Sequence, residues 1–243
     1  MKLPGITVRG RIAQCWLFVY RAPAETVAAL LPPQIEAVKK DGFAFWNIVV
    51  CRLDGMRPSL LPAAIGLGYW HVAYRIHVRA TKVSGEPIEG LFFVRSDCDR
   101  RLMAVAGNWL TAFNFHLAEI GIATGASGVT GKIVSPDAAA SFEIDHRIVP
   151  QLAPGSPFHS LGAAANALEY KPAALSAGET DAVNVVAVRR DAAAWRWKPV
   201  AIADAHWQFL ESRDATLELC YEVEPVEYVW ERARTVRVKS CAS

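Results

Sequence analysis

The sequence lacks an apolar segment long enough to cross a membrane as a helix. Its longest apolar stretches stay well below the roughly 18 residues that a spanning helix needs. The N-terminal stretch MKLPGITVRGRIAQ has no uninterrupted apolar core of the kind found in signal peptides. These two absences predict a cytoplasmic protein with no membrane partner.

Patterns typical of metal and cofactor sites are also missing. The chain has 5 cysteines without any Cys-x-x-Cys spacing, so neither a disulfide framework nor a zinc ribbon is indicated. The His-Glu-x-x-His motif is absent, and His71 and His77 would lie about 20 Å apart along a strand, too far apart to share one ion. Helix-opening glycine loops and the Gly-x-Ser-x-Gly motif are absent too. The sequence therefore predicts no metal and no cofactor.

Charge of one sign is not concentrated anywhere over a long stretch. The chain carries 26 Lys and Arg against 24 Asp and Glu, a net charge of +2. A protein that binds nucleic acid needs a contiguous basic patch to contact the phosphates. The sequence offers only a modest cluster near its C-terminus, formed by Arg232, Arg234, Arg237 and Lys239. No nucleic-acid partner is expected.

The sequence is rich in β-strand patterning. Its apolar content of 52% and charged content of 21% are typical of a globular protein, and its length fits a single domain over 1–243. Strands are predicted at 12–21, 35–38, 43–53, 70–78, 90–95, 113–120, 128–134, 141–149, 182–189, 217–225 and 228–238. Helices are predicted at 22–31, 99–111 and 160–170, and 201–208 is a helix or a loop. This pattern predicts an α+β fold that is mainly antiparallel β.

The segment 70–78 alternates most clearly between apolar and polar side chains. A strand places successive side chains on opposite faces. One face therefore carries Trp70, Val72, Tyr74, Ile76 and Val78, and the other carries His71, Ala73, Arg75, His77 and Arg79. If the second face points inward, its histidines and arginines favour a carboxylate or another anion. If it points to solvent, its basic side chains need no function.

Four stretches, taken in order, resemble the YqjF-like family of unknown function, within the acetoacetate decarboxylase-like superfamily. They are ALLPPQIEAVKKDGFAFWNIVVCRL, Met56–Pro62, His71–Arg75 and Phe92–Glu119. The resemblance covers the first half of the chain most closely. It implies an acetoacetate decarboxylase-like barrel with a few peripheral helices. Within the last stretch, Asp97 and Arg101 are expected to brace a strand-to-helix junction as an ion pair, and Gly107 is expected to be structural.

The lysine that the superfamily's decarboxylases use is missing here. Those enzymes carry Gly-Arg-Glu followed by Pro-Lys-Lys, and the first lysine of the second motif forms the imine. Aligned at Gly107, this chain has Asn114 at the proline and Phe115 and His116 at the two lysines. A Schiff base needs a neutral lysine, for which acetoacetate decarboxylase is itself the standard example. Because Phe115 cannot form an imine, the decarboxylase mechanism is not expected.

The remaining candidates define a pocket. His116 is the candidate catalytic residue, a general acid or base near neutral pH. Cys98 lies near a helix N-terminus and two arginines, where a thiol can become reactive, but a structural role explains it more simply because Asp97 and Asp99 flank it. The residues predicted to bind a ligand are His71, Arg75, His77, Trp109, Asn114 and Phe115.

Three functions stay open at this stage. The first is non-covalent binding of a small organic anion or oxo compound in a central pocket. The second is a lyase that acts on a keto acid through an acid/base site or a relocated lysine. The third is a structural or interaction protein with a filled barrel. If the chain is an enzyme, a non-covalent acid/base lyase or isomerase is expected rather than a Schiff-base decarboxylase. A homodimer is compatible with the strand edges.

Overall fold

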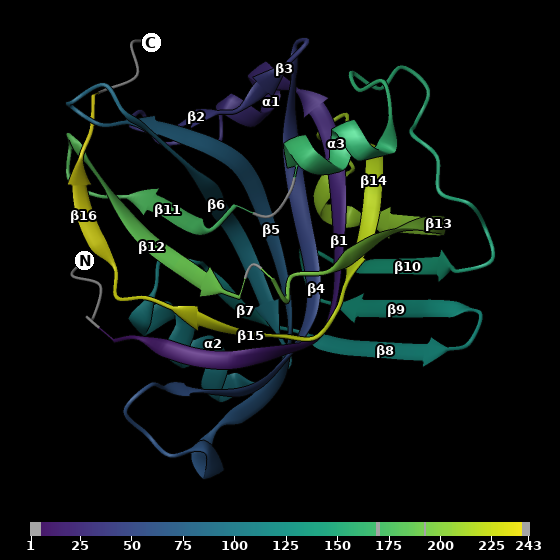
Figure 1. The fold of residues 1–243 in the computed structure, drawn as a ribbon, viewed down its shortest axis with the longest axis horizontal. Helices are drawn as coiled ribbons and strands as arrows, with labels where there is room; N and C mark the ends of the chain where they lie inside the picture. The colour runs from purple at the N-terminus through teal and green to yellow at the C-terminus, as the bar shows by residue number, and fades with distance from the viewer. Residues whose placement is uncertain (1–5, 169–170, 192, 240–243) are drawn as a thin grey trace.

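Four long strands form the framework of the fold (Figure 1). The computed structural model describes residues 6–168, 171–191 and 193–239. The long strands are β1 (Val8–Pro23), β4 (Phe43–Pro58), β5 (Leu67–Thr81) and β6 (Pro87–Cys98). They are rich in β-branched and aromatic residues, which fit a pleated, buried surface. They pair antiparallel in the order β1–β4–β5–β6.

A tight Asp-Gly turn precedes β4. Asp41 and Gly42 have φ values of 49° and 85° and connect β3 (Lys39–Lys40) to β4, with Lys40 paired to Phe43. Positive φ at both central residues belongs to the two-residue hairpin turn whose twist matches the flanking strands. The turn thus fixes the register at which β4 begins.

The strands close into a hydrogen-bonded circuit. Strand β6 continues through the parallel neighbour β11 (Ala173–Ala177) to β12 (Ala182–Arg190) and β15 (Val226–Trp230). Strand β15 pairs with the first half of β1, which also pairs with β4. We call this circuit of β1, β4, β5, β6, β11, β12 and β15 the ring. The sheet is therefore highly curved, and its mostly antiparallel strands and few helices confirm the expected α+β, mainly antiparallel fold.

A second set of strands branches from β1. The second half of β1 pairs with β14 (Thr216–Val223). From β14 the sheet continues in order through β13 (Trp197–Trp207), β10 (Ala140–Asp145), β9 (Gly128–Val134) and β8 (Glu119–Gly125). The shorter elements are β2 (Glu36–Ala37), β7 (Phe115–Leu117), β16 (Arg234–Arg237) and the single turns η1 (Ala63–Ile65) and η2 (Gln208–Leu210). The segment 201–208, predicted as a helix or loop, instead lies mostly in β13.

Three α-helices lie among the described residues, as the sequence predicted. They are α1 (Ala24–Ala28), α2 (Arg101–Leu110) and α3 (Leu161–Leu168). Residues 169 and 170 of the predicted third helix lie outside the described residues. Helix α2 has no side-chain cap, and Asp99, two residues before it, instead accepts the backbone N–H of Trp70 through Oδ1 at 2.9 Å.

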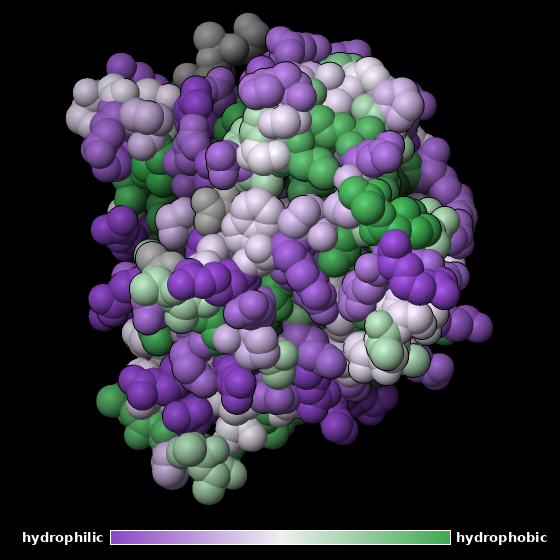
Figure 2. Space-filling model, turned by 45° about the vertical axis from the view of Figure 1, so that its right-hand side comes forward, coloured by the Kyte–Doolittle hydropathy of each residue, from purple (hydrophilic) through white to green (hydrophobic). Residues whose placement is uncertain are grey.

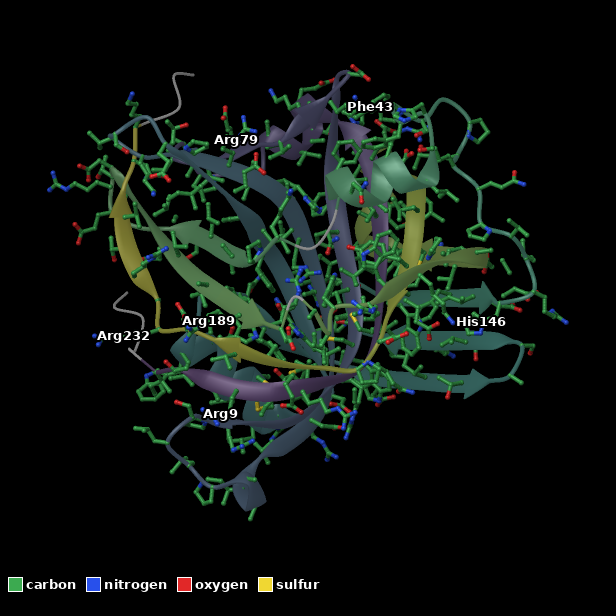
Figure 3. All side chains as sticks on the ribbon, in the orientation of Figure 1. Arg9, Phe43, Arg79, His146, Arg189 and Arg232 are labelled. Carbon is green, nitrogen blue, oxygen red and sulfur yellow. The ribbon has the colours of Figure 1, made fainter. Side chains whose placement is uncertain are left out.

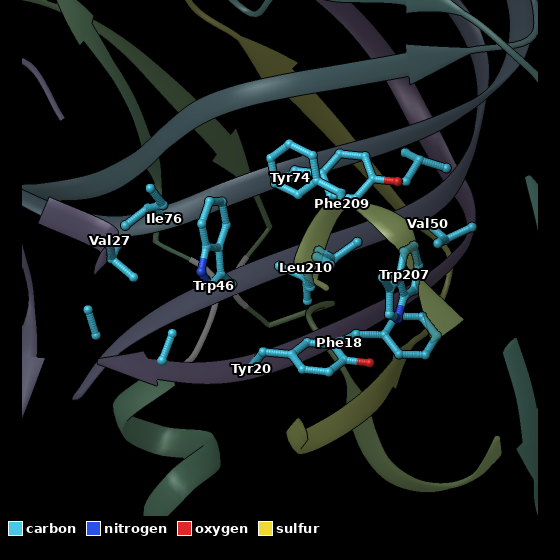
Figure 4. Packing of buried hydrophobic residues seen from close by; sticks show 14 of the residues in the cluster. Phe18, Tyr20, Val27, Trp46, Val50, Tyr74, Ile76, Trp207, Phe209 and Leu210 are labelled. Carbon is cyan, nitrogen blue, oxygen red and sulfur yellow. The ribbon is translucent and has the colours of Figure 1, made fainter. Parts of the chain in front are cut away.

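Both faces of β5 are buried, each in its own core. The outer core lies between the ring and the branching strands and includes Trp46, Tyr74 and Phe209, whose rings meet in Figure 4. The ring centroids of Tyr74 and Phe209 lie 4.4 Å apart. The inner core draws side chains from every strand of the ring and from α2 and α3. The face of β5 that carries His71 and Arg75 thus points into the ring.

Candidate functional site

His71 lies in a row of side chains that crosses the inner wall of the ring. Cys51 of β4 pairs with His71, and His71 pairs with Cys98 of β6. Residues opposite each other in antiparallel strands share a face. His71 is 6% exposed. Period-2 alternation therefore buries a titratable imidazole between two thiol-bearing strands.

Arg75 lies on the same face, deeper in the ring. It is 3% exposed, and its Nη2 and Nε donate to the side-chain and backbone oxygens of Asn47, the latter at 3.4 Å. Its guanidinium carbon lies 5.6 Å from the centroid of the Phe93 ring. A break in the β5–β6 register places Phe93 opposite Arg75 and turns Arg95 to the other face. This β-bulge at Val94 thus supplies the aromatic ring that covers Arg75.

A cavity of about 130 Å³ opens beside His71 under helix α2. Its apolar wall comes mainly from β1, β4, α2, β7 and β15. The wall includes Val8, Leu53, Met56, Met103, Ala106, Leu110, Phe115 and Trp230. Its polar lining residues are Tyr69, His71, Thr111, Ser176, Tyr228 and Glu231. An apolar cavity with a few polar groups is the usual form of a small-molecule site.

A smaller inner cavity of about 40 Å³ lies next to the first and reaches Arg75. Four residues line both cavities: Leu53, His71, Tyr228 and Trp230. Among the described residues that line the two cavities there is no lysine. Together they extend from α2 toward Arg75.

His71 is held neutral. Burial, and to a smaller extent the nearby Arg75, lowers its pKa to about 3. Its ring stacks on Phe115, with centroids 5.2 Å apart and planes 18° apart. Neither Nε2 of His71 nor Nε1 of Trp230 has a hydrogen-bond partner among the described residues. Buried polar atoms are normally paired, so two unpaired atoms on residues that line the cavity are unusual.

Phe115 reaches His71 because Gly107 and Asn108 hold it there. The side chain of Asn108 bonds both backbone groups of Phe115: its Nδ2 donates to the carbonyl at 2.7 Å, and its Oδ1 accepts the N–H at 2.6 Å. A Cβ atom at Gly107 would lie 2.4 Å from the Phe115 ring. Only glycine therefore lets α2 pack directly on this ring, in keeping with the structural role expected for Gly107.

Replacing Gly107 with alanine is expected to destabilise the fold by about 2 kcal/mol, because the added methyl overpacks the contact with Phe115. Gly162 in α3 is the matched control, since a Cβ there meets no atom within 4 Å. Its replacement by alanine is expected to be neutral or stabilising. Urea denaturation of both variants measures the difference. Equal stability of Gly107→Ala and the wild type would show that Phe115 moves aside freely.

His116 lies away from the two cavities, on the opposite face of the sheet. It pairs with Asp97 across β6 and β7, on the face where the bulge also places Arg95. Burial and Arg95 lower the pKa of His116. Burial raises the pKa of Asp97 to about 6. The candidate catalytic histidine thus belongs to a separate polar cluster.

The expected ion pair of Asp97 with Arg101 is wrong. Asp97 Oδ1 instead accepts Arg95 Nε at 2.9 Å, and Arg95 Nη2 donates to Ser135 Oγ at 2.8 Å. Arg101 is exposed at the first position of α2. The bulge explains the difference, because it turns Arg95 to the face of Asp97.

The other predicted ligand residues are dispersed. Phe115 lines the outer cavity with His71, whereas Trp109 is 73% exposed and lines neither cavity. Asn114 is exposed and donates from Nδ2 to the carbonyl of Val94 at 3.1 Å, so it braces the bulge. His77 is 1% exposed beyond Arg75 and lines neither cavity. Burial, then Lys171 and Arg75, lowers its pKa to about 3.

Several lining residues gave no sequence signal of their own. Tyr228 and Trp230 lie in a C-terminal strand that is far from His71 in sequence and adjacent in the ring. In the sequence, Asn47 is a single polar residue within the otherwise apolar stretch 43–50, and nothing there indicates its partner. Its pairing with Arg75 across β4 and β5 needed the register of the sheet. The alternation of side chains along β15 predicts that Tyr228 and Trp230 share one face of the strand. It does not indicate whether that face points into the ring.

The described residues contain no group of three or more His, Cys, Asp or Glu side chains that is able to hold a metal ion. Within the same residues, no helix is long and apolar enough to span a membrane.

Comparisons with known proteins place the fold and the family. Residues 11–229 match the family DUF2071, described as an uncharacterized conserved protein. No curated protein matches the chain in sequence. An acetoacetate decarboxylase-like enzyme from Sphingomonas wittichii RW1 is similar in structure, with a TM-score of 0.62 at 15% identity over 97% of this chain and 95% of that chain. The family match covers most of the chain, and the structural match shows that the chain has the expected acetoacetate decarboxylase-like fold.

Two further solved structures share the fold. Acetoacetate decarboxylase from Legionella pneumophila aligns with a TM-score of 0.59 at 14% identity, over 98% of this chain and 90% of that chain. The enduracididine biosynthesis enzyme MppR, complexed with the condensation product of pyruvate and imidazole 4-carboxaldehyde, aligns with a TM-score of 0.54 at 12% identity, over 98% and 91%. At these identities the similarity describes the fold alone.

Proposed function

The chain belongs to the uncharacterized family DUF2071. We propose that it binds a small oxo-containing molecule non-covalently beside His71. The observation that carries the proposal is the pair of unpartnered atoms, His71 Nε2 and Trp230 Nε1, on residues that line both cavities. An indole N–H only donates, and a neutral imidazole nitrogen donates or accepts according to its tautomer. A carbonyl oxygen accepts two hydrogen bonds and so matches both.

Arg75 extends this preference to oxo acids. Arg75 lines the inner cavity, and a guanidinium pairs well with carboxylates. A ligand with a carbonyl near His71 and a carboxylate toward Arg75 uses both polar regions, while its carbon skeleton contacts Leu53 and Tyr228. Pyruvate is a suitable first probe, since a structure of MppR, which shares the fold, is complexed with pyruvate.

Two observations favour binding over the superfamily's covalent chemistry. The first is the lack of a lysine among the described residues that line the cavities. The second is the pKa of about 3 at His71. An imidazole with so low a pKa is a weak general base near neutral pH. It is well suited to hydrogen bonding in its neutral form.

Filling the outer cavity is expected to weaken pyruvate binding roughly tenfold or more, because a bulky side chain takes the ligand's place. Ala106→Phe tests this, since Ala106 lines the cavity. Val105→Phe is the matched control, because Val105 is on the same helix and 64% exposed. Isothermal titration calorimetry measures the dissociation constants.

His71→Phe gives an independent test. It keeps an aromatic ring against Phe115 and removes Nε2. The proposal fails if no small oxo acid or ketone binds the wild type. It also fails if Ala106→Phe and His71→Phe both bind as the wild type does.

A further inference from the structure

The connection between β4 and β5 exposes an unusually apolar segment. Residues 60–67 read LLPAAIGL and contain no polar side chain. Seven of these eight residues are exposed, and Leu60 at the tip is 97% exposed. The segment projects from the body at the bottom of Figure 1, and green, apolar atoms gather at the same lower edge in Figure 2. A contiguous apolar surface of this kind marks an interaction site.

Helix α2 adds a second exposed apolar stripe nearby. Leu102, Val105 and Trp109 are 62%, 64% and 73% exposed and follow helical spacing. The start of β5 links the two surfaces, because the N–H of Asp99 donates to the carbonyl of Trp70 at 3.3 Å, just before α2 begins. Both segments also contribute to the rim of the outer cavity, through Met56 beside the projection and Ala106 on the helix.

Arginines are concentrated in the segments that carry and flank this apolar projection. Arg9 of β1 is paired directly with Arg57 of β4. Residues 6–11, 52–67 and 99–111 together carry six arginines against two aspartates, although the whole chain has a net charge of only +2. Arg9 is labelled at the lower edge of the ring in Figure 3. The arginines are Arg9, Arg11, Arg52, Arg57, Arg100 and Arg101.

We propose that the 60–67 projection inserts into an anionic lipid surface, with α2 lying along it. In such a surface the apolar tip contacts the acyl chains, and the basic residues behind the tip contact the phosphates of the head groups. The chain turns after Arg57, since the N–H of Leu61 donates to the carbonyl of Pro58 at 3.0 Å, and Arg57 Nε donates to the carbonyl of Leu61 at 3.3 Å. The Arg57 guanidinium is thus held beside the projection, within reach of the head groups when the apolar tip is inserted. Insertion therefore places the guanidinium groups among the lipid phosphates.

Charge favours a lipid surface over a second copy of the chain. A symmetric dimer through this face would bring the arginines of both copies together, which opposes association. The proposal departs from the expectation of no membrane partner. That expectation rested on the absence of a spanning segment, whereas surface insertion needs only a short apolar tip. It does not depend on what the cavity binds.

Co-sedimentation with vesicles tests the proposal. The probes are phosphatidylcholine vesicles with and without 30% phosphatidylglycerol. Wild-type protein is expected to bind the anionic vesicles preferentially and to be released by high salt. Leu60→Asp is expected to lower the bound fraction roughly tenfold, because it places a carboxylate in the acyl region. Val149→Asp is the matched control, since Val149 is 75% exposed outside the projection and the helix.

Three results would overturn the proposal. One is no binding of the wild type to either kind of vesicle. Another is equal binding of Leu60→Asp and the wild type. The last is a dimer in light scattering that Leu60→Asp dissociates, without any vesicle binding, which would make a second copy the occupant. Because Leu60 is 97% exposed, its replacement leaves the core intact, and thermal unfolding verifies the fold of each variant.

Discussion

Acidification from pH 6.5 to pH 4 is expected to lower the free energy of unfolding by about 4 kcal/mol. His71 and His77 both have a pKa lowered to about 3 by burial. The unfolded chain takes up protons at both histidines below about pH 6.5, and the folded chain does not. Stability from these groups is therefore complete above pH 6.5 and lost as the pH falls. Each contributes about 3 kcal/mol of the loss at pH 4.

Asp97 acts in the opposite direction over part of this range. Burial raises its pKa to about 6, above its ordinary value of 3.8. The folded chain then holds this proton more tightly than the unfolded chain, so the contribution of Asp97 decreases as the pH rises from 4 to 6. It offsets about 2 kcal/mol of the loss of about 6 kcal/mol at the two histidines, which leaves the net loss of about 4 kcal/mol. Asp97→Asn is thus expected to steepen the acid destabilisation.

Urea denaturation at several pH values between 4 and 6.5 measures how steeply the free energy of unfolding changes with pH. The double variant His71→Gln/His77→Gln is expected to remove the loss on acidification, since glutamine does not titrate. His159→Gln is the matched control, because His159 is exposed. An unchanged slope in the double variant would show that the two imidazoles already take up protons in the folded chain.

Removal of the Glu218 carboxylate is expected to cost about 3–5 kcal/mol of stability. Glu218 Oε2 lies 2.5 Å from Arg21 Nη1, and the two side chains are 0% and 9% exposed. Ser156 donates to the other carboxylate oxygen, and Arg21 Nη2 donates to the carbonyl of Pro154 at 2.8 Å. The pair ties the loop before α3 to β1 and β14. Without Glu218, the guanidinium stays buried without its partner.

Two comparisons isolate this effect. Glu218→Ala is measured beside Asp181→Ala, which removes an exposed ion pair with Arg237 and is expected to cost less than about 1 kcal/mol. The double variant Arg21→Met/Glu218→Ala is expected to recover part of the loss, because no unpaired charge remains. If Glu218→Ala costs no more than Asp181→Ala, the buried pair does not anchor the loop.

The fold followed from local patterns in the sequence. Alternation in β5 placed His71 and Arg75 on one face, and the Asp41-Gly42 step fixed the hairpin at β4. These features depend on neighbours along the chain, so a single sequence contains them. The direction of the alternating face did not follow, since both faces of β5 are buried.

The site depended on features that local patterns do not contain. The bulge at Val94 shifts the alternation of β6, so Phe93 enters the ring while Arg95 and Asp97 leave it. This shift separates His116 from His71 and pairs Asp97 with Arg95. Trp230 reaches the cavity through the pairing of β15 with β1. Such long-range register is set by packing and closure of the ring.

The central claim is that the cavity beside His71 holds an oxo ligand without a covalent bond. A crystal structure of the chain with pyruvate tests it most directly. The expected result is ligand density in the cavity, with a ligand oxygen within hydrogen-bonding distance of His71 Nε2 and Trp230 Nε1. Pyruvate density outside the cavity, or density continuous with a lysine Nζ, would contradict the claim.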